Sequence, residues 1–550
     1  MKRLKPKRKA VIIWVDAGTF TVINPLLKRG KIPAFQRIIK EGTSGQLIST
    51  IPPHTALAWA SFATGVNPGK HGVYGFWHVG KRASMIYNNS YSIRRETLWS
   101  MLNKANKKVI LINAPMTYPP RKTDGIVITG LMTPGDIPFT YPEKIRKEIL
   151  REIPEYRVYT HTDSHANKQL YLEEAKSLLK ARCDATLYLM ENYDWDLLFS
   201  AFYYTDQIQH VFWKDMDPTH PGHDPDAPKM FKQAIPKAYE IIDDSIRRIL
   251  NTIDEDTLLI VMSDHGAGPV YKYVFINNYL RELGLIKESR KGTMKVALDH
   301  LLGKFKITKG RLPSLSEYAL APFRAFFRKM WGVKESQSMQ FAKSVDWAQT
   351  RVFCAGCYAQ LWVNNDKIRS SSEYQRLIDY LIKKLYDLRD PENGVKIVDE
   401  VFRRSQIYWG QYANMAPDLF CVMRKMTYIQ PGTTTPFRSK QIVTPSRNSG
   451  DHRMEGMLIM YGKDVKSGYV LKDCSIMDLT PTILYLMDNK VPSDVDGKVL
   501  EDAFNPSYIR EHPVRRRDVT QISTEQEQHA LSEADEKEIL QRLKELGYME

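Results

Sequence analysis

Three short apolar segments of this chain are each followed directly by polar or ionisable residues, which are uncommon in a hydrophobic core. AVIIWV (10–15) is followed by Asp16, LLFSAFYY (197–204) by Thr205-Asp206, and TLLIVM (257–262) by Ser263-Asp264-His265. Runs of this length, rich in β-branched and aromatic residues, are typical of buried strands. We therefore expect buried strands whose carboxyl ends carry aspartate or histidine.

Helical patterns separate the apolar runs. Apolar residues recur with a period near 3.6 in residues 34–41, 171–193 and 236–252, and further strand-like runs lie at 109–112, 126–129 and 457–461. Strands that alternate with helices imply a mostly parallel sheet that is covered on both faces. The predicted fold class is therefore α/β, doubly wound, with an inserted cap.

Five regions are expected along the 550 residues. They are a basic leader (1–9), a first part of the α/β core (10–285), a basic inserted cap (286–345), a second part of the core (346–510) and a tail with a helix (511–550). The final helix is predicted from a capping-box-like Ser532-Glu-Ala-Asp535 and an apolar stripe at Ile539, Leu540, Leu543 and Leu546.

The net charge of +16 is concentrated in two of these regions. Residues 1–9 hold six Lys or Arg and no acid, and residues 286–334 hold twelve Lys or Arg against three acids. The rest of the chain is nearly neutral. Two interpretations of residues 286–334 stay open: contact with an anionic membrane or nucleic acid, or a cap that turns its charges to water.

Several candidate ligands fall at the expected carboxyl ends of strands, where open α/β sheets bind their ligands. They are Asp16, Asp206, Asp264 and His265. His210 follows Asp206 by four residues, so both side chains share one face if a helix begins there. Carboxylate and imidazole groups in this arrangement are suited to hold a cation. A helix-capping Asp with an ordinary core or surface His is the alternative.

Two further segments carry candidate residues. In TIPPHTALAWASFATGVNPGKH (50–71), Thr55 falls in the first turn of a predicted helix, where amide groups and the helix dipole favour an anion. An ordinary capping threonine is the alternative. In Ser449-Gly-Asp-His452, a histidine follows a glycine-containing turn just before the strand predicted at 457–461.

Taken together, five separated motifs resemble those of the alkaline phosphatase superfamily, in the same order. They are IIWVDAG, PPHTALAWASFATGVNPGKHG, TDQIQH, SDHG and GDHRMEG. The chain is most similar to the type I phosphodiesterase/nucleotide pyrophosphatase branch, from about residue 10 to residue 500. This resemblance implies an alkaline phosphatase-like fold and a metal-dependent hydrolase that cleaves phosphodiester or pyrophosphate bonds.

The resemblance also implies two divalent cations, Zn²⁺ in the first instance and Mn²⁺ as the alternative. By motif match, Asp16, Thr55, Asp264 and His265 would surround one cation, and Asp206, His210 and His452 would hold the other. Thr55 would be the nucleophile, deprotonated by the first cation, and would form a phosphothreonine intermediate. Activation by a metal suits a threonine hydroxyl, which is a weak nucleophile near pH 7.

The sequence departs from the branch at two positions. Asp16-Ala17-Gly18 replaces the usual Asp-Gly, and Phe76 stands where the nucleotide-cleaving subgroup has an asparagine that helps to hold the phosphoryl oxygens. Phenylalanine cannot donate a hydrogen bond, which weakens the assignment to nucleotide substrates. A sulfatase-type CxPSR motif is absent from the sequence. His54 and His71 are interpreted as structural or supporting residues.

Other functions of the same site stay open: a phosphomonoesterase, a phosphomutase or a phosphoryl or head-group transferase. An alternative of another class is a basic membrane-surface or nucleic-acid binding protein with a vestigial metal site. The five cysteines do not form a disulfide framework, and Cys354-Ala-Gly-Cys357 is interpreted as packing. The apolar run after the basic leader is too short for a signal peptide, so we expect a cytoplasmic protein with a phosphate-ester substrate and no transmembrane segment.

Overall fold

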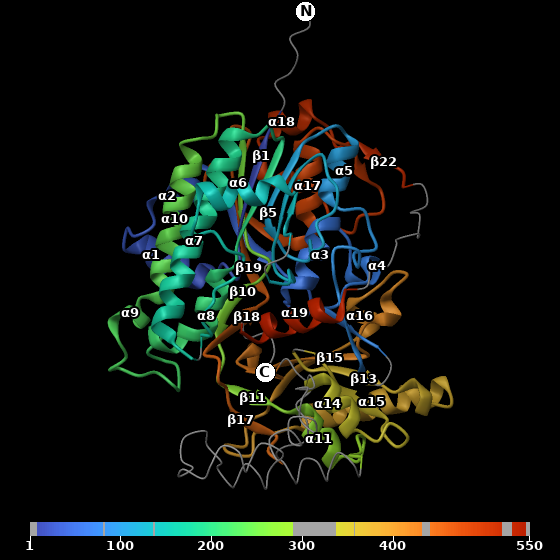
Figure 1. Cartoon of the computed structure of the whole chain (residues 1–550). Helices are drawn as coiled ribbons and strands as arrows, with labels where there is room; N and C mark the ends of the chain where they lie inside the picture. The colour runs from blue at the N-terminus through green and yellow to red at the C-terminus, as the bar shows by residue number, and fades with distance from the viewer. Residues whose placement is uncertain are drawn as a thin grey trace, which may run out of the picture.

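The structure is a computed structural model that describes residues 8–80, 83–135, 138–164, 166–289, 337–356, 358–431, 440–519 and 531–545. It forms an α/β body with a smaller lobe beneath it (Figure 1). Within the described residues, no helix combines the length and the hydrophobicity that crossing a bilayer requires.

A nine-stranded sheet forms the centre of the body, in the order β20-β2-β19-β9-β1-β8-β5-β6-β7. Its strands are β1 (Ala10–Val15), β2 (Thr43–Ile48), β5 (Val109–Ala114), β6 (Gly125–Thr129), β7 (Thr140–Tyr141), β8 (Leu197–Phe202), β9 (Leu258–Met262), β19 (Glu455–Tyr461) and β20 (Tyr469–Ser475). The strands from β9 to β6 are all parallel to one another, whereas β19 runs antiparallel to both β9 and β2. The mostly parallel sheet is confirmed.

The three strands with polar ends are adjacent in this sheet. β1 lies between β8 and β9, with Trp14 opposite Ala201 on one side and Met262 on the other. Every residue of these three strands is buried, which explains why their sequences are continuously apolar rather than alternating. Because the strands are parallel and in register, their carboxyl ends meet at one edge of the sheet.

Helices cover both faces of the sheet (Figure 1). One layer of mutually contacting helices comprises α1 (Phe20–Lys28), α2 (Pro33–Glu41), α7 (Lys168–Asn192), α8 (Tyr204–Met216) and α10 (Ala234–Leu250). The other comprises α3 (Thr55–Thr64), α5 (Leu98–Lys104) and α17 (Leu479–Leu486). The three helices expected from the 3.6-residue period correspond to α2, α7 and α10, so the doubly wound class is confirmed.

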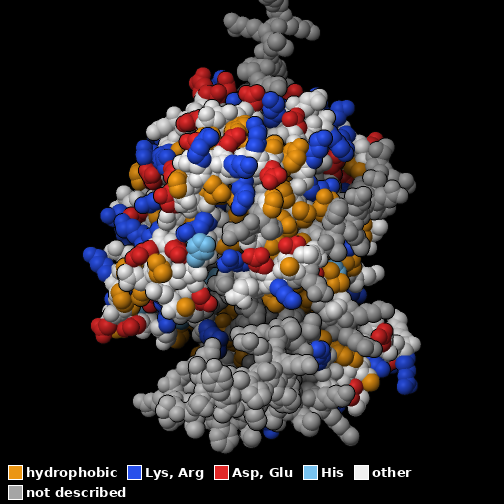
Figure 2. Space-filling view, viewed as in Figure 1, with side chains coloured by type: hydrophobic (Ala, Val, Ile, Leu, Met, Phe, Trp, Pro, Cys, Tyr) orange, Lys and Arg blue, Asp and Glu red, His pale blue; other side chains and the backbone are white. Residues whose placement is uncertain are grey.

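Charges of both signs are distributed over the surface of the body. On the face that Figure 2 shows, Lys and Arg side chains are interspersed with Asp and Glu and with apolar side chains. Ion pairs between described residues include Arg37–Glu41 at 3.2 Å and Lys108–Asp194 at 3.1 Å. This mixture agrees with the nearly neutral charge of the chain outside its two basic regions.

The smaller lobe has its own sheet and its own apolar core. Its four antiparallel strands follow the order β12 (Val352–Cys354), β13 (Gln360–Val363), β15 (Leu419–Met423) and β14 (Val398–Arg403), and it also holds α11 (Ile276–Glu282), α14 (Gln337–Ser344) and α15 (Ser371–Asp387). From the sequence, the second part of the core is expected to begin at residue 346. In the structure, the chain returns to the large sheet only at Glu455. Short strands with buried faces look alike in sequence whichever sheet they join.

The remaining elements connect these two parts or lie at their edges. They are β3 (Trp77–Val79), β4 (Met85–Tyr87), β10 (Gly266–Pro269), β11 (Lys272–Val274), β16 (Tyr428–Ile429), β17 (Val443–Pro445), β18 (Gly450–Arg453), β21 (Val491–Pro492), β22 (Arg516–Arg517), α4 (Pro68–His71), α6 (Lys144–Glu152), α9 (Lys229–Lys232), α16 (Arg404–Ile407), α18 (Pro506–Glu511) and α19 (Glu533–Glu545).

Some sequence-based predictions fall on residues that the structure does not describe. Residues 1–7 of the leader and 290–336 of the basic insertion are among them, as are Cys357 and Leu546. The C-terminal helix is described as α19, and Ser532 and Asp535 exchange the two hydrogen bonds of a capping box. Ile539 and Leu543 are buried against the body.

Candidate active site

The carboxyl edge of β9, β1 and β8 brings the predicted residues together. Asp16 directly follows β1, Asp264 and His265 follow β9, and Asp206 lies in the first turn of α8 after β8. Together with Thr55, His210 and His452 they are all buried, the most exposed being His210 at 6%. The structure therefore gathers all seven residues that the sequence analysis selected.

Asp16, Asp264 and His265 form the first group. His265 Nε2 lies 3.2 Å from Asp264 Oδ2 and 3.6 Å from Asp16 Oδ1. One ligand atom from each residue lies within 4.8 Å of the others, a spacing that one cation can span. Thr55 joins this group, because its Oγ1 is 3.2 Å from His265 Nε2.

Thr55 is placed by the helix that it begins. His54 caps α3, since its Nδ1 accepts a hydrogen bond from the Ala56 amide at 3.2 Å, and the helix ends at Gly65 in the left-handed conformation. All ten residues of α3 are buried, so the helix is fixed from every side. The Thr55 hydroxyl thus lies at the positive end of the helix dipole, which favours negative charge nearby.

The second group contains Asp206, His210 and His452. His210 Nε2 lies 3.1 Å from Asp206 Oδ2, and His452 Nε2 lies 3.5 Å from Asp206 Oδ1. The Nδ1 atom of His210 donates to the Gly450 carbonyl at 2.8 Å, and that of His452 to the Pro53 carbonyl at 2.7 Å. These bonds leave Nε2 of both imidazoles turned toward the carboxylate, as metal-binding histidines require.

His452 reaches the site through β18, which pairs with β10 so that His452 lies opposite Ala267. A Cβ atom at Gly450 would lie 2.4 Å from the Gln209 carbonyl oxygen, so glycine is required for this close approach to α8. The His452 ring stacks on His265, with centroids 3.7 Å apart and planes 20° apart. The two groups are therefore contiguous.

The buried carboxylates repel one another. Burial, followed by repulsion from Asp264 and Asp206, raises the pKa of Asp16 well above its ordinary value. Burial also disfavours the charge of Asp206, but His210 and His452 outweigh it and hold the pKa of Asp206 well below the usual range. Burial by itself would lower the pKa of His210, but the negative charge of Asp206 outweighs it and raises this pKa to about 10.

These residues fit two divalent cations. Neither carboxylate oxygen of Asp16 has a hydrogen-bond partner among the described residues, although the side chain is 1% exposed. A buried carboxylate without a donor is costly unless a cation balances it. The donor set of three carboxylates and three imidazoles, with one hydroxyl, is one that borderline divalent cations prefer.

Two contacts at the site were not anticipated from the sequence. The Trp14 indole N–H donates to Asp264 Oδ1 at 2.9 Å, and Asp451 forms a further possible ligand group with His210 and His452. Asp451 could have been noticed as a carboxylate next to a candidate histidine. Nothing in the sequence pairs Trp14 with a residue 250 positions away.

His54, His71 and Phe76 lie beside the site. In the described part of the chain, neither His54 nor His71 belongs to a group with metal-ligand spacing. His71 is fully buried, with Nε2 3.0 Å from Ser61 Oγ and Nδ1 accepting from the Val73 amide at 3.2 Å. Phe76 is also buried, and its ring meets His54 edge-on at 4.8 Å.

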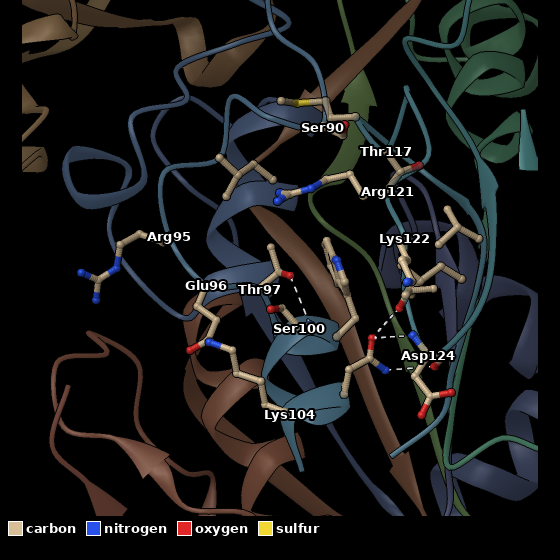
Figure 3. A pocket seen from close by; sticks show the side chains of 17 residues that line it. Ser90, Arg95, Glu96, Thr97, Ser100, Lys104, Thr117, Arg121, Lys122 and Asp124 are labelled. Carbon is tan, nitrogen blue, oxygen red and sulfur yellow. Dashed lines mark hydrogen bonds and ion pairs between the residues drawn. The ribbon is translucent and has the colours of Figure 1, made fainter. Parts of the chain in front are cut away.

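A separate cavity of about 820 Å³ lies beside α5 (Figure 3). Charged residues of both signs line it, including Arg95, Arg121 and Asp124. Trp99 on its wall stacks on Trp59 at 5.5 Å, and Trp59 stacks on Trp14 at 5.4 Å. Since none of its described lining residues belongs to the two ligand groups, this cavity is distinct from the candidate active site.

The fold and the paired ligand groups define the class as an alkaline phosphatase-like, metal-dependent phosphoryl hydrolase. The family model of type I phosphodiesterase/nucleotide pyrophosphatase matches residues 10–452, and the chain belongs to this family. A comparison with curated protein sequences gave no match.

Solved structures with the same fold include phosphonoacetate hydrolase from Sinorhizobium meliloti 1021, crystallised with phosphonoformate. It is 14% identical with a TM-score of 0.51, and the alignment covers 88% of this chain and 96% of that one. Alkaline phosphatase PafA is 14% identical with a TM-score of 0.51, covering 91% and 100%. Human ectonucleotide pyrophosphatase/phosphodiesterase 5 is 11% identical with a TM-score of 0.49, covering 90% and 100%.

Proposed function

We propose that this hydrolase cleaves phosphodiester or pyrophosphate bonds, with Thr55 as the nucleophile. The observation that carries the proposal is the position of Thr55 Oγ1, 3.2 Å from His265 Nε2 and beside Asp16 and Asp264. In the first step a bond forms from Oγ1 to phosphorus while the bond to the leaving oxygen breaks. Water then attacks the phosphothreonine, releases the phosphate product and restores the Thr55 hydroxyl.

The chain's own residues prepare this reaction in three ways. Helix α3 fixes Oγ1 and directs its dipole toward the incoming phosphoryl group. Burial of the ligand groups keeps them rigid, and the Nδ1 hydrogen bonds of His210 and His452 set the orientation of both imidazoles.

Two cations would be held by the residues of the two groups, with Thr55 completing the first. When bound, they would lower the pKa of the Thr55 hydroxyl and balance the charges of the phosphoryl oxygens. We propose Zn²⁺, with Mn²⁺ as the alternative, because imidazole and carboxylate together suit these ions better than Mg²⁺ or Ca²⁺. Elemental analysis of the purified chain should find about two equivalents.

The test replaces Thr55 by Ala and by Ser in the full chain, with turnover of an aryl phosphodiester as the readout. Thr55→Ala should reduce turnover by at least about 10³-fold while both cations stay bound, and Thr55→Ser should retain measurable turnover. Thr64→Ala is the matched control, because Thr64 lies in the same helix and its hydroxyl bonds to the Ala60 carbonyl, at 2.6 Å. If the Thr55→Ala variant retained turnover, Thr55 would be excluded as the nucleophile.

The same preparation should be tested on aryl diesters and monoesters. Membership of the phosphodiesterase family favours the diester. We do not assign a nucleotide as leaving group, since Phe76 offers no hydrogen-bond donor and packs against His54. A faster monoester reaction would contradict the proposed bond type, and transfer to an alcohol in place of water would identify a transferase.

A cytoplasmic location is also proposed. Cys183, Cys421 and Cys474 are free and buried, which suits a reducing compartment. Cell fractionation tests this proposal directly. Contact of residues 286–334 with an anionic surface stays a prediction, and a liposome pull-down with and without this segment tests it.

A further inference from the structure

One side chain of the smaller lobe bonds to Asp451, the neighbour of the candidate ligand His452. Tyr358 lies in the turn between β12 and β13, and its hydroxyl donates to Asp451 Oδ1 at 2.6 Å. The same oxygen accepts the backbone N–H of His452 at 2.7 Å. One carboxylate oxygen thus connects the lobe to the backbone that carries a candidate metal ligand.

The turn holds Tyr358 in an uncommon conformation. Gly356, Tyr358 and Ala359 have φ angles of 93°, 62° and 51°. A positive φ is unfavourable for residues with a side chain and persists only when the surrounding structure compensates for it. At Tyr358 the compensation includes a short hydrogen bond to a carboxylate, a type of bond about twice as strong as one between neutral groups.

Tyr358 is also enclosed where the lobe meets the body. It is 6% exposed and belongs to an apolar cluster with Val270, Phe420, Met426 and Ile429. Its ring centroid lies 5.7 Å from that of His452. The low polarity of this environment strengthens a hydrogen bond that is fully made.

The same hairpin contacts the other side of the site. Gly356 and Gln360 line a cavity of about 10 Å³ that is also lined by His54, the residue that caps the Thr55 helix. A space of this size holds about one water molecule. The hairpin from Cys354 to Gln360 therefore packs closely beside the segments that carry Thr55 and His452.

We propose that Tyr358 is a positioning residue for His452: through Asp451 it fixes the backbone and ring of His452, and so couples the smaller lobe to the second cation. This inference rests on the two-cation site of the proposed function. Tyr358 need not touch the substrate. Its effect is on the placement of one ligand, His452. Loss of such a supporting bond typically weakens metal affinity about 10- to 100-fold.

The experiment titrates the metal-free full chain with Zn²⁺ in a calorimeter and compares wild type with Tyr358→Phe. We expect two ions to bind both proteins, with one of the two dissociation constants raised about tenfold in the variant and the other unchanged.

Tyr428→Phe is the matched control. Tyr428 donates to the buried Asp390 at 2.8 Å, so this change also removes a tyrosine–carboxylate bond, but at residues outside the ligand groups. Both variants should lose similar thermal stability, and only Tyr358→Phe should lose Zn²⁺ affinity. Equal Zn²⁺ affinities in wild type and Tyr358→Phe overturn the inference and leave the proposed function standing. A wild-type chain that binds fewer than two ions overturns both.

Discussion

The indole N–H of Trp14 donates a hydrogen bond to Asp264 Oδ1 at 2.9 Å, inside a sheet in which β1 and β9 are neighbours. Trp14 belongs to β1, and Asp16 directly follows this strand, so one segment supplies both a candidate ligand and the donor that orients another. The indole ring is fixed in turn by Trp59, which stacks on it with planes 8° apart. Asp264 is thus held in one orientation.

Replacing Trp14 by Phe should weaken binding of the first cation about 10- to 100-fold, because the supporting bond to a ligand is lost while the aromatic packing is largely kept. Zn²⁺ calorimetry measures the change. Trp59→Phe is the control, since the Trp59 indole N–H is buried and has no hydrogen-bond partner among the described residues. That variant should bind Zn²⁺ as wild type does, and equal losses in both variants would show that ring packing alone matters.

Removing the cations should destabilise the protein. Without them the carboxylates of Asp16, Asp206 and Asp264 repel one another in a buried space, and ligand binding energy is lost. A site with free ion at about 100 times its dissociation constant contributes about 2.7 kcal/mol. The thermal midpoint should therefore fall in a strong chelator and recover when Zn²⁺ is added. An unchanged midpoint would argue against a metal site.

Asp16→Asn should stabilise the metal-free chain and abolish activity of the loaded one. The pKa of Asp16 is raised in the folded state by burial and by its acidic neighbours, so folding favours the protonated form. Wild type without metal should therefore gain stability as the pH falls from that raised pKa toward the ordinary aspartate pKa of about 3.9, by up to about 1.4 kcal/mol per pH unit. Denaturant unfolding in chelator at several pH values should show a flatter profile for Asp16→Asn.

His71 should make the protein sensitive to acid. Burial, followed by repulsion from Arg95, lowers the pKa of His71 to about 3. The unfolded chain therefore binds the proton more readily, so this stability is fully present above the ordinary pKa of about 6.5 and is lost as the pH falls toward about 3. The loss reaches about 1.4 kcal/mol per pH unit.

The substitution His71→Asn tests this expectation, because the amide oxygen can still accept from the Val73 backbone. Its unfolding free energy should fall less steeply than that of wild type between about pH 6 and pH 4. His223→Asn is the control, since His223 is only half-buried and lies outside the apolar core. If the unfolding free energy of His71→Asn depended on pH as steeply as that of wild type, His71 would not be the source of the acid sensitivity.

Much of the large sheet could be predicted because its signals are local. A continuous apolar run reports a strand buried on both faces, and parallel strands bring their polar ends to one edge. For this reason Asp16, Asp206 and Asp264 stand out together in the sequence. The i, i+4 spacing of Asp206 and His210 is likewise a property of one helix, and the structure places their side-chain atoms 3.1 Å apart.

Other features depend on which distant segments pair. His452 meets Asp206 only because β18 pairs with β10 and glycine at position 450 lets it approach α8. The sequence does not distinguish the second sheet, from Val352 to Met423, from the large one. Short antiparallel strands have the same apolar pattern in either sheet.

The sequence by itself therefore determined the fold class, the family resemblance and the residue types at the strand ends, because periodicity and motif order are written along the chain. Only the tertiary structure decided that Trp14 supports Asp264 and that Tyr358 of the smaller lobe supports Asp451. These contacts join residues 250 and 93 positions apart. Their partners are set by how whole elements pack, which no local pattern specifies.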